Sequence, residues 1–274
     1  MKIITFFLSV FLIISCQDVV NLDLENKESK LVIQANITFQ KQTSGASQVI
    51  RLTKSADFYN NVVPAANGAI VSVTNNNTQQ IFNFIEDNNS GLYKCNNFIP
   101  IFLNTYTLKI NYQNNNYLAT EKLMPVAAIS ELVQDASGGI NGKEIVVKAF
   151  YIDTPTEENF YLFNYFYTDK EDDFVKPVFY VSKDIFYNGN LFFSTTFKNG
   201  LKTGDEIKIT HFGISQNYYN YLVVLLRLAN QNAGPFTAPP VAVRGNIINQ
   251  NNQNDFPFGY FSLSESDEKL YIVK

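Results

Sequence analysis

Residue types that support catalysis or metal binding are scarce in this chain of 274 residues, which has one histidine and two cysteines. His211 stands in the alternating segment 207–212, with no second histidine or cysteine paired to it as a metal ligand. A nucleophilic triad would need this same histidine, and no Gly-x-Ser-x-Gly elbow accompanies it. We therefore predict that His211 is a core or interface residue with satisfied hydrogen bonds, and that the protein is not an enzyme.

The remaining reactive side chains give no better site. The acidic run 171–173 lacks the Asp-x-Asp-x-Asp-Gly spacing of a calcium loop, so we expect a solvated turn. Glu144, Asp153 and Glu206 would suit glycoside hydrolysis only if two of these carboxylates lay about 5 to 9 Å apart, which depends on the fold. Cys95 follows a strand and is predicted to be a buried, inert thiol. No cofactor and no metal are expected.

Cys16 carries the strongest chemical signal. It closes a segment that starts with Lys2, continues as an apolar run over residues 3–14 and ends with Ser15. This order is typical of a secretory signal peptide, and the run is shorter than the roughly 20 residues that cross a bilayer. The last five residues, Leu-Ile-Ile-Ser-Cys, resemble the lipobox of bacterial lipoproteins, which implies cleavage before Cys16 and lipid attached to it. Two or more acyl chains anchor a protein stably, so we predict lipid anchoring. An ordinary signal peptide with a chance cysteine is the alternative.

The composition indicates a globular protein. Hydrophobic residues make up 46% of the chain and charged residues 17%. A formal net charge of −4 without a basic block excludes a nucleic-acid footprint. With Cys16 lipidated, Cys95 has no partner for an intrachain disulfide, so packing must hold the cores together.

Short alternating segments fill residues 31–125 and predict an Ig-like antiparallel β-sandwich. Gly, Asn and Pro clusters separate segments 31–37, 49–52, 69–73, 81–84, 106–110 and 117–120. Before this domain we expect a signal peptide over residues 1–15 and a lipidated tether over residues 16–30. A proline-containing hinge at 124–127 leads into a second domain over residues 126–274. The fold class is therefore mainly β.

The second domain is predicted to be β-rich with one packed helix. We expect strands at 144–152, 160–168, 178–182, 191–197, 206–212, 258–263 and 270–273. Residues 159–167 are aromatic on both faces, which indicates a strand covered on both sides. The apolar period becomes helical over about residues 215–232, with Ser215 as N-cap. Leu225 lies in the middle of the apolar stripe, so we predict that it is buried against the sheet.

Motifs along nearly the whole chain carry a family resemblance. They lie at 20–24, 30–33, 49–55, 67–71, 91–93 and 106–108, and the most specific are at 215–221, 239–240, 244–247 and 258–261. Together they resemble the domain-of-unknown-function lipoproteins of the Bacteroidota outer membrane, which are often encoded beside TonB-dependent receptors. The resemblance implies an outer-membrane location, on its periplasmic or its cell-surface face, and an accessory role beside such a barrel.

We therefore expect a non-enzymatic accessory subunit of a TonB-dependent nutrient transporter. The alternative is a free-standing surface module that binds glycan or peptide. Aromatic and arginine side chains are favoured as interface anchors. Tyr219 falls off the apolar stripe of the helix, and Phe236, Arg244 and Tyr260 lie in or beside the long Pro- and Asn-rich connection after it. These four residues are the predicted partner contacts, although this connection would also serve simply to turn the chain.

Overall fold

The computed structural model describes residues 29–56, 62–139, 141–155, 157–168, 177–196, 198–229 and 242–274. Its first half contains β1 (Leu31–Gln40), β2 (Gln48–Lys54), β3 (Ile70–Asn75), β4 (Ile81–Glu86), β5 (Leu92–Cys95), β6 (Thr105–Tyr112) and β7 (Asn115–Lys122). The rest contains β8 (Ile129–Gly138), β9 (Glu144–Ile152), β10 (Phe160–Thr168), β11 (Val178–Lys183), β12 (Leu191–Thr195), β13 (Glu206–Ile214), α2 (Gln216–Ala229), β14 (Ile248–Asn249) and β15 (Phe258–Ile272). The predicted mainly β fold with one helix is confirmed. Cys16, Phe236 and the acidic run 171–173 lie outside the described residues.

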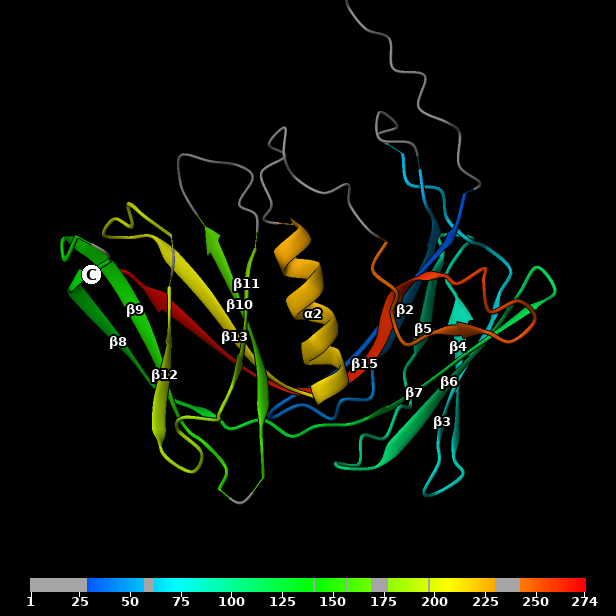
Figure 1. The fold of residues 1–274 in the computed structure, drawn as a ribbon, viewed down its shortest axis with the longest axis horizontal. Helices are drawn as coiled ribbons and strands as arrows, with labels where there is room; N and C mark the ends of the chain where they lie inside the picture. The colour runs from blue at the N-terminus through cyan, green and yellow to red at the C-terminus, as the bar shows by residue number, and fades with distance from the viewer. Residues whose placement is uncertain are drawn as a thin grey trace, which may run out of the picture.

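The strands form one large sheet and one small one (Figure 1). The large sheet has twelve strands in the order β11-β10-β13-β15-β1-β2-β5-β4-β3-β6-β7-β14, and the small one has the order β12-β9-β8. Within the described part of the chain, no helix has both the length and the apolar character that a membrane span needs.

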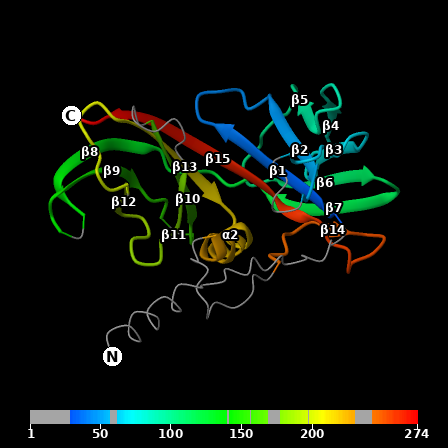
Figure 2. The ribbon, with the colours of Figure 1, turned by 90° about the horizontal axis from the view of Figure 1, so that it is seen from above.

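Strand β15 joins the two halves of the molecule. Its first part runs parallel to β1, with Val32 opposite Phe258, and its second part runs antiparallel to β13, with Glu206 opposite Ile272. Figure 2 shows β15 extending from the β1 side to the far end of the second half. Because one continuous strand serves both halves, we expect them to support each other.

The first half is sandwich-like. The large sheet turns over on itself at β4, which pairs with β3 on one side and with β5 on the other. Alternate side chains then meet inside, and Leu52, Val73 and Leu108 are fully buried. Each such buried side chain stabilises the fold by roughly 1.5–3 kcal/mol. Phe261 and Leu263 of β15 belong to this core too, and the division into domains at residue 126 stays a prediction.

The middle of β15 departs from the sequence prediction of two strands, at 258–263 and 270–273. The strand is continuous, although its centre is polar and buried. The Glu265 carboxylate accepts a hydrogen bond of 2.8 Å from the backbone N–H of Val126, and the Asp267 carboxylate accepts one of 2.7 Å from that of Ile129. Buried polar groups are stable when they are hydrogen-bonded in this way. Glu265 and Asp267 therefore tie the segment 126–129, where the first half leads into the second, to the middle of β15.

In the second half, β10 is covered on both faces only at its N-terminal end, whereas the prediction was cover along the whole of residues 159–167; Phe166 is 40% exposed. Tyr161 and Phe163 face the core beneath the small sheet, while Phe160 and Leu162 face α2. Ser215 caps α2 as expected, because its hydroxyl accepts a hydrogen bond of 3.1 Å from the backbone N–H of Tyr218.

The prediction that Leu225 is buried is wrong. It is 36% exposed, whereas Leu222 is 7% exposed and packs with Phe160 and Leu162. The row of Tyr218, Leu222 and Leu226 is turned toward the sheet, and Leu225 is rotated away from it. The helix therefore buries a narrower stripe than its apolar sequence suggests.

Candidate functional site

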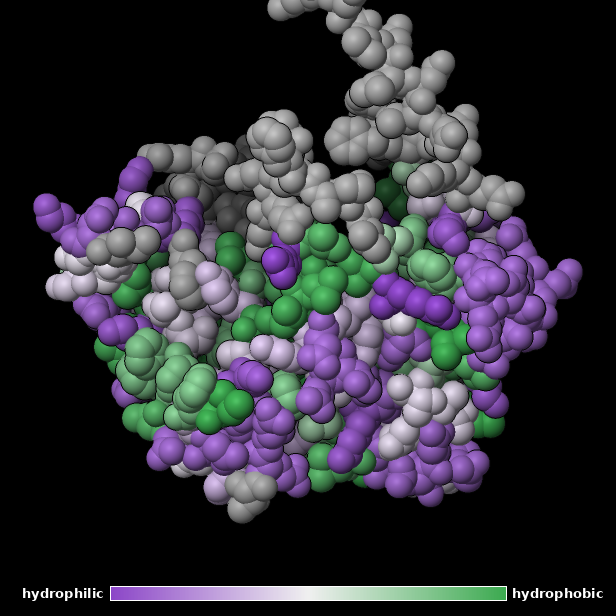
Figure 3. Space-filling model, in the orientation of Figure 1, coloured by the Kyte–Doolittle hydropathy of each residue, from purple (hydrophilic) through white to green (hydrophobic). Residues whose placement is uncertain are grey.

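The outward side of α2 is an exposed apolar surface. Val223, Val224 and Leu225 are 39%, 49% and 36% exposed, and we call these three residues the α2 outer face. Figure 3 shows apolar residues gathered over this helix. The only basic residue in its last turn is Arg227, and its first turn has no acidic residue. A helix that is apolar on nearly every side is normally covered, so this surface suits contact with another apolar surface.

Tyr219 contributes less surface than expected. It is half-buried, and its ring lies 5.2 Å from the ring of Phe160 on β10. Its hydrophobic side thus completes the packing of α2 against the sheet, which leaves only part of the ring for a partner.

Tyr260 is not available as a surface contact. It is 5% exposed, and the rings of Tyr218 and Tyr221 each lie 4.7 Å from its own. Its hydroxyl donates a hydrogen bond of 3.1 Å to the Glu121 carboxylate. Burial raises the pKa of Glu121, which favours the protonated form of this carboxyl. Its place beside the long connection after the helix had suggested an accessible ring, but Tyr218 and Tyr221 of α2 cover it.

Arg244 is exposed, as a contact residue should be. Its guanidinium carbon lies 5.1 Å from the centre of the Phe256 ring, and one of its nitrogens donates a 3.2 Å hydrogen bond to the carbonyl of Gln253. Lys30 also approaches Phe256, with Nζ 4.8 Å from the ring centre. Figures 1 and 2 place the segment around β14 on the same side of the molecule as α2.

His211 is a core residue, as predicted. It is fully buried, and its ring stacks on Phe163 at 4.1 Å and lies 4.6 Å from Tyr151. Burial lowers the pKa of His211 to about 3, so its imidazole is neutral at neutral pH. No group of three or more potential metal ligands occurs in the described part of the chain.

The thiol and the carboxylates are dispersed. Cys95 is buried, as expected, with its Sγ 3.1 Å from the Asn97 side-chain oxygen. Asp153 is buried, where it accepts hydrogen bonds from the Tyr161 hydroxyl and, at 2.8 Å, from the backbone N–H of Gly189. Glu206 is exposed at the start of β13. These bonds give Asp153 a structural role.

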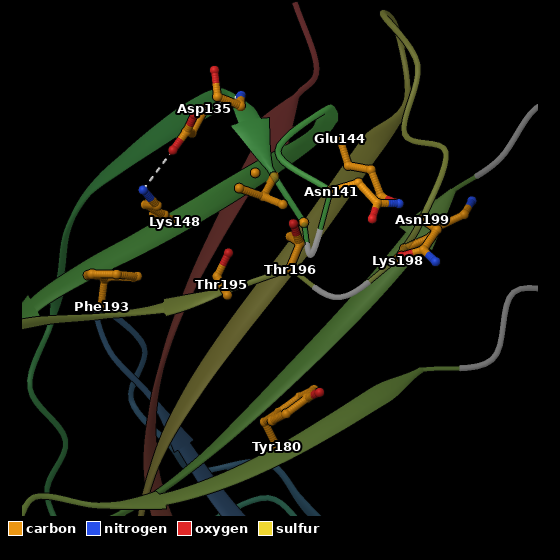
Figure 4. Close-up of a pocket in the computed structure, with 14 residues that line it drawn as sticks. Asp135, Asn141, Glu144, Lys148, Tyr180, Phe193, Thr195, Thr196, Lys198 and Asn199 are labelled. Carbon is orange, nitrogen blue, oxygen red and sulfur yellow. Dashed lines mark hydrogen bonds and ion pairs between the residues drawn. The ribbon is translucent and has the colours of Figure 1, made fainter.

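A pocket of about 860 Å³ opens between the small sheet and β11 (Figure 4). No motif in the sequence predicted this pocket, because its lining comes from four separate strands and two connections. Asp135 and Lys148 lie on one side, Glu144, Asn141, Lys198 and Asn199 on the other, and Thr195 and Thr196 between them. Of the carboxylates considered for hydrolysis, Glu144 alone lines this pocket.

Local contacts hold the pocket walls in place. Lys148 Nζ lies 2.8 Å from the Asp135 carboxylate and 5.3 Å from the centre of the Phe193 ring. The hydrogen bond from Lys148 lowers the pKa of Asp135. The Thr196 hydroxyl accepts a 2.9 Å hydrogen bond from the backbone N–H of Val147, which ties the end of β12 to β9. These contacts hold the Asp135–Lys148 wall and the end of β12 in place.

Comparisons with known proteins add a family and a distant structural likeness. A family model described as a domain of unknown function (DUF4249) matches residues 17–270. Among solved structures, the chain is similar to a DUF4785 family protein from Legionella pneumophila at 7% identity and a TM-score of 0.29. That alignment covers 67% of this chain and 52% of the other, so this chain matches about half of that protein's length. A search of the curated proteins gave no match.

Proposed function

We propose that the chain, which belongs to the family described as a domain of unknown function (DUF4249), acts as an outer-membrane lipoprotein, as the resemblance of its sequence to such lipoproteins implies. In this role it is a non-enzymatic accessory subunit of a TonB-dependent nutrient transporter, anchored by lipid on Cys16. The α2 outer face is the single observation that best supports a partner, because it leaves three apolar side chains of one helix in solvent.

The proposed anchor is compatible with this arrangement. Lys30 follows Cys16 by fourteen positions, and a fully extended segment of that length spans at most roughly 50 Å. The folded body thus stays close enough to the membrane to meet the rim of a barrel. The chain segment around β14 lies on the same side of the molecule as α2 (Figures 1 and 2), and Arg244, which precedes β14, is an exposed charged residue suited to a polar contact with the same partner.

Copurification from native membranes tests the proposal. The double variant Val223→Gln, Val224→Gln removes apolar surface from an exposed helix position without emptying a core. Val49→Gln is the matched control, since Val49 is 43% exposed on β2 in the other half. We expect the wild type and the control to capture a TonB-dependent barrel, and the double variant to capture about tenfold less, as when a central apolar contact is lost.

Anchoring and docking are separated by a third protein, Cys16→Ala. It should lose acyl labelling and membrane attachment. The assignment is wrong if the wild type captures no barrel, or if the folded double variant captures as much as the wild type.

A further inference from the structure

We infer that the pocket between the small sheet and β11 binds a neutral, hydroxyl-rich ligand with apolar faces, of the size of a short oligosaccharide. This inference stands whether the protein docks on a barrel or works alone, because it concerns a different surface from the α2 outer face. The pocket volume of about 860 Å³ lies within the range of roughly 300–1,000 Å³ found for ligand sites.

The charges around the pocket balance. Asp135 and Glu144 supply two carboxylates, and Lys148 and Lys198 supply two ammonium groups. Asp135 forms an ion pair with Lys148 at 2.8 Å, so these two charges neutralise each other and neither attracts a charged ligand strongly. A phosphate or a polyanion would need an excess of positive charge, so a neutral ligand fits this lining better.

Hydrogen-bonding groups remain for the ligand. The Thr195 hydroxyl is buried on β12 and has no hydrogen-bond partner among the described residues. Figure 4 shows Thr195 in the middle of the pocket, between the two polar walls. Buried polar groups are normally satisfied, and the Thr195 oxygen is shielded from solvent as it stands. We therefore expect the Thr195 side chain to rotate about χ1 when a ligand enters, and its hydroxyl to bond to a ligand group. Glu144 and Asn141 add an acceptor and an amide on one side.

Aromatic rings supply the apolar part of the site. Phe193 is 37% exposed on β12, and Tyr180 lines the pocket from β11, across from it. A sugar ring has C–H faces that are buried well against such rings, and hydroxyls around its edge that bond to side chains. Rings combined with threonine, amide and carboxylate groups match this double character better than they match a purely apolar ligand.

The test uses the full chain purified in a detergent without a sugar headgroup, such as dodecyldimethylamine oxide. Titration calorimetry measures the binding of maltotriose, cellotriose, xylotriose and chitotriose at millimolar concentration. The variants are Thr195→Val and Phe193→Ala. Their matched controls are Thr107→Val on β6 and Phe166→Ala on β10, where Phe166 is 40% exposed on a strand that does not line the pocket.

We expect at least one of the four sugars to bind. Thr195→Val should weaken that binding about fivefold, the usual effect of one lost neutral hydrogen bond. Phe193→Ala should weaken it about tenfold or more, and neither control should change it. Because the Thr195 hydroxyl has no partner within the described protein, Thr195→Val should leave the melting temperature unchanged or raise it.

Three results would overturn the inference: no binding of any of the four sugars, unchanged binding in both pocket variants, or binding of trialanine or trigalacturonic acid in place of a neutral sugar. None of them bears on copurification with a barrel, so this inference and the proposed function fail separately.

Discussion

The two halves of the molecule satisfy their buried tyrosine hydroxyls in different ways. In the first half, the Tyr93 hydroxyl donates to the carbonyl of Ala66 and accepts from the backbone N–H of Ala69, both at 2.9 Å. In the second half, the Tyr151 hydroxyl donates to that of Tyr187 at 3.1 Å. The first pattern fastens loops to strands, and the second links side chains to one another across the core.

This difference follows from how each half encloses its core. The first half is one sheet turned over on itself, so loop backbone lies next to its interior and takes up polar groups. The second half places the small sheet over β10 and β13, and large rings such as Tyr161 and Phe163 fill the space between them. Where the two sheets diverge toward β11, side chains no longer fill the gap and the pocket remains.

The largest expected effect comes from the strand that the halves share. Phe261 on β15 is fully buried in the first core, so Phe261→Ala should lower the free energy of unfolding by about 3–5 kcal/mol. Since β15 also pairs with β13, hydrogen-exchange protection should fall in both halves together. Loss of protection in the first half alone would show that the halves unfold independently.

A smaller effect tests how α2 attaches to the second half. Leu222→Ala should cost about 2–3 kcal/mol, because Leu222 is 7% exposed in the cluster with Phe160 and Leu162. Leu225→Ala, on the outer face, should cost about 1 kcal/mol or less. Urea unfolding of the two variants measures the difference, and equal losses would contradict the observed orientation of the helix.

A pH experiment addresses the aromatic core of the second half. Burial lowers the pKa of His211 from its ordinary value of 6.5 to about 3. Between these two pH values the histidine is protonated in the unfolded chain and neutral in the folded chain. The contribution of His211 to the free energy of unfolding is therefore fully present above pH 6.5. It decreases as the pH falls, by about 2 kcal/mol at pH 5. His211→Phe keeps a ring against Phe163 and should abolish this part of the slope in denaturant titrations. An unchanged slope would mean that other groups cause it.

Local alternation was sufficient to predict most strands and the helix. Residues 81–84 and 106–110 lie within β4 and β6, and Ser215 begins the helix because capping is a local interaction. The polar centre of β15 was missed because Glu265 and Asp267 have partners more than a hundred residues away.

The candidate sites depend even more on contacts that are distant in sequence. Tyr260 was predicted to be accessible, but α2 covers it. The alternation of apolar and polar residues along a strand does not show which other element packs on that strand. Leu225 was placed correctly on a helix and wrongly in the core, since the apolar residues extend around more of the helix than the sheet can bury. Predicting the pocket would have required knowing how β8, β9, β11 and β12 lie relative to one another, which cannot be inferred from any single segment.

A small difference between two tyrosine variants tests the opening comparison directly. Tyr93→Phe leaves the Ala66 carbonyl and the Ala69 N–H unpaired, and should cost about 1–3 kcal/mol. Tyr187→Phe should cost less, about 0.5–1 kcal/mol. The Tyr187 hydroxyl accepts from Tyr151 at 3.1 Å and donates to Ser182 at 3.2 Å. In Tyr187→Phe the Tyr151 and Ser182 hydroxyls can still bond to each other, whereas the backbone groups of a fixed loop cannot pair again.

Thermal unfolding of Tyr93→Phe, Tyr187→Phe, Tyr151→Phe and the double variant Tyr151→Phe/Tyr187→Phe measures this contrast. The double variant removes both hydroxyls of the second half together, so its cost should be less than the sum of the Tyr151→Phe and Tyr187→Phe costs, as for residues in contact. Suppose that Tyr187→Phe costs as much stability as Tyr93→Phe, and that the cost of the double variant equals the sum of its two single costs. The hydroxyls of the second half would then contribute to stability independently of one another. The two halves would then not differ in how their tyrosines are held.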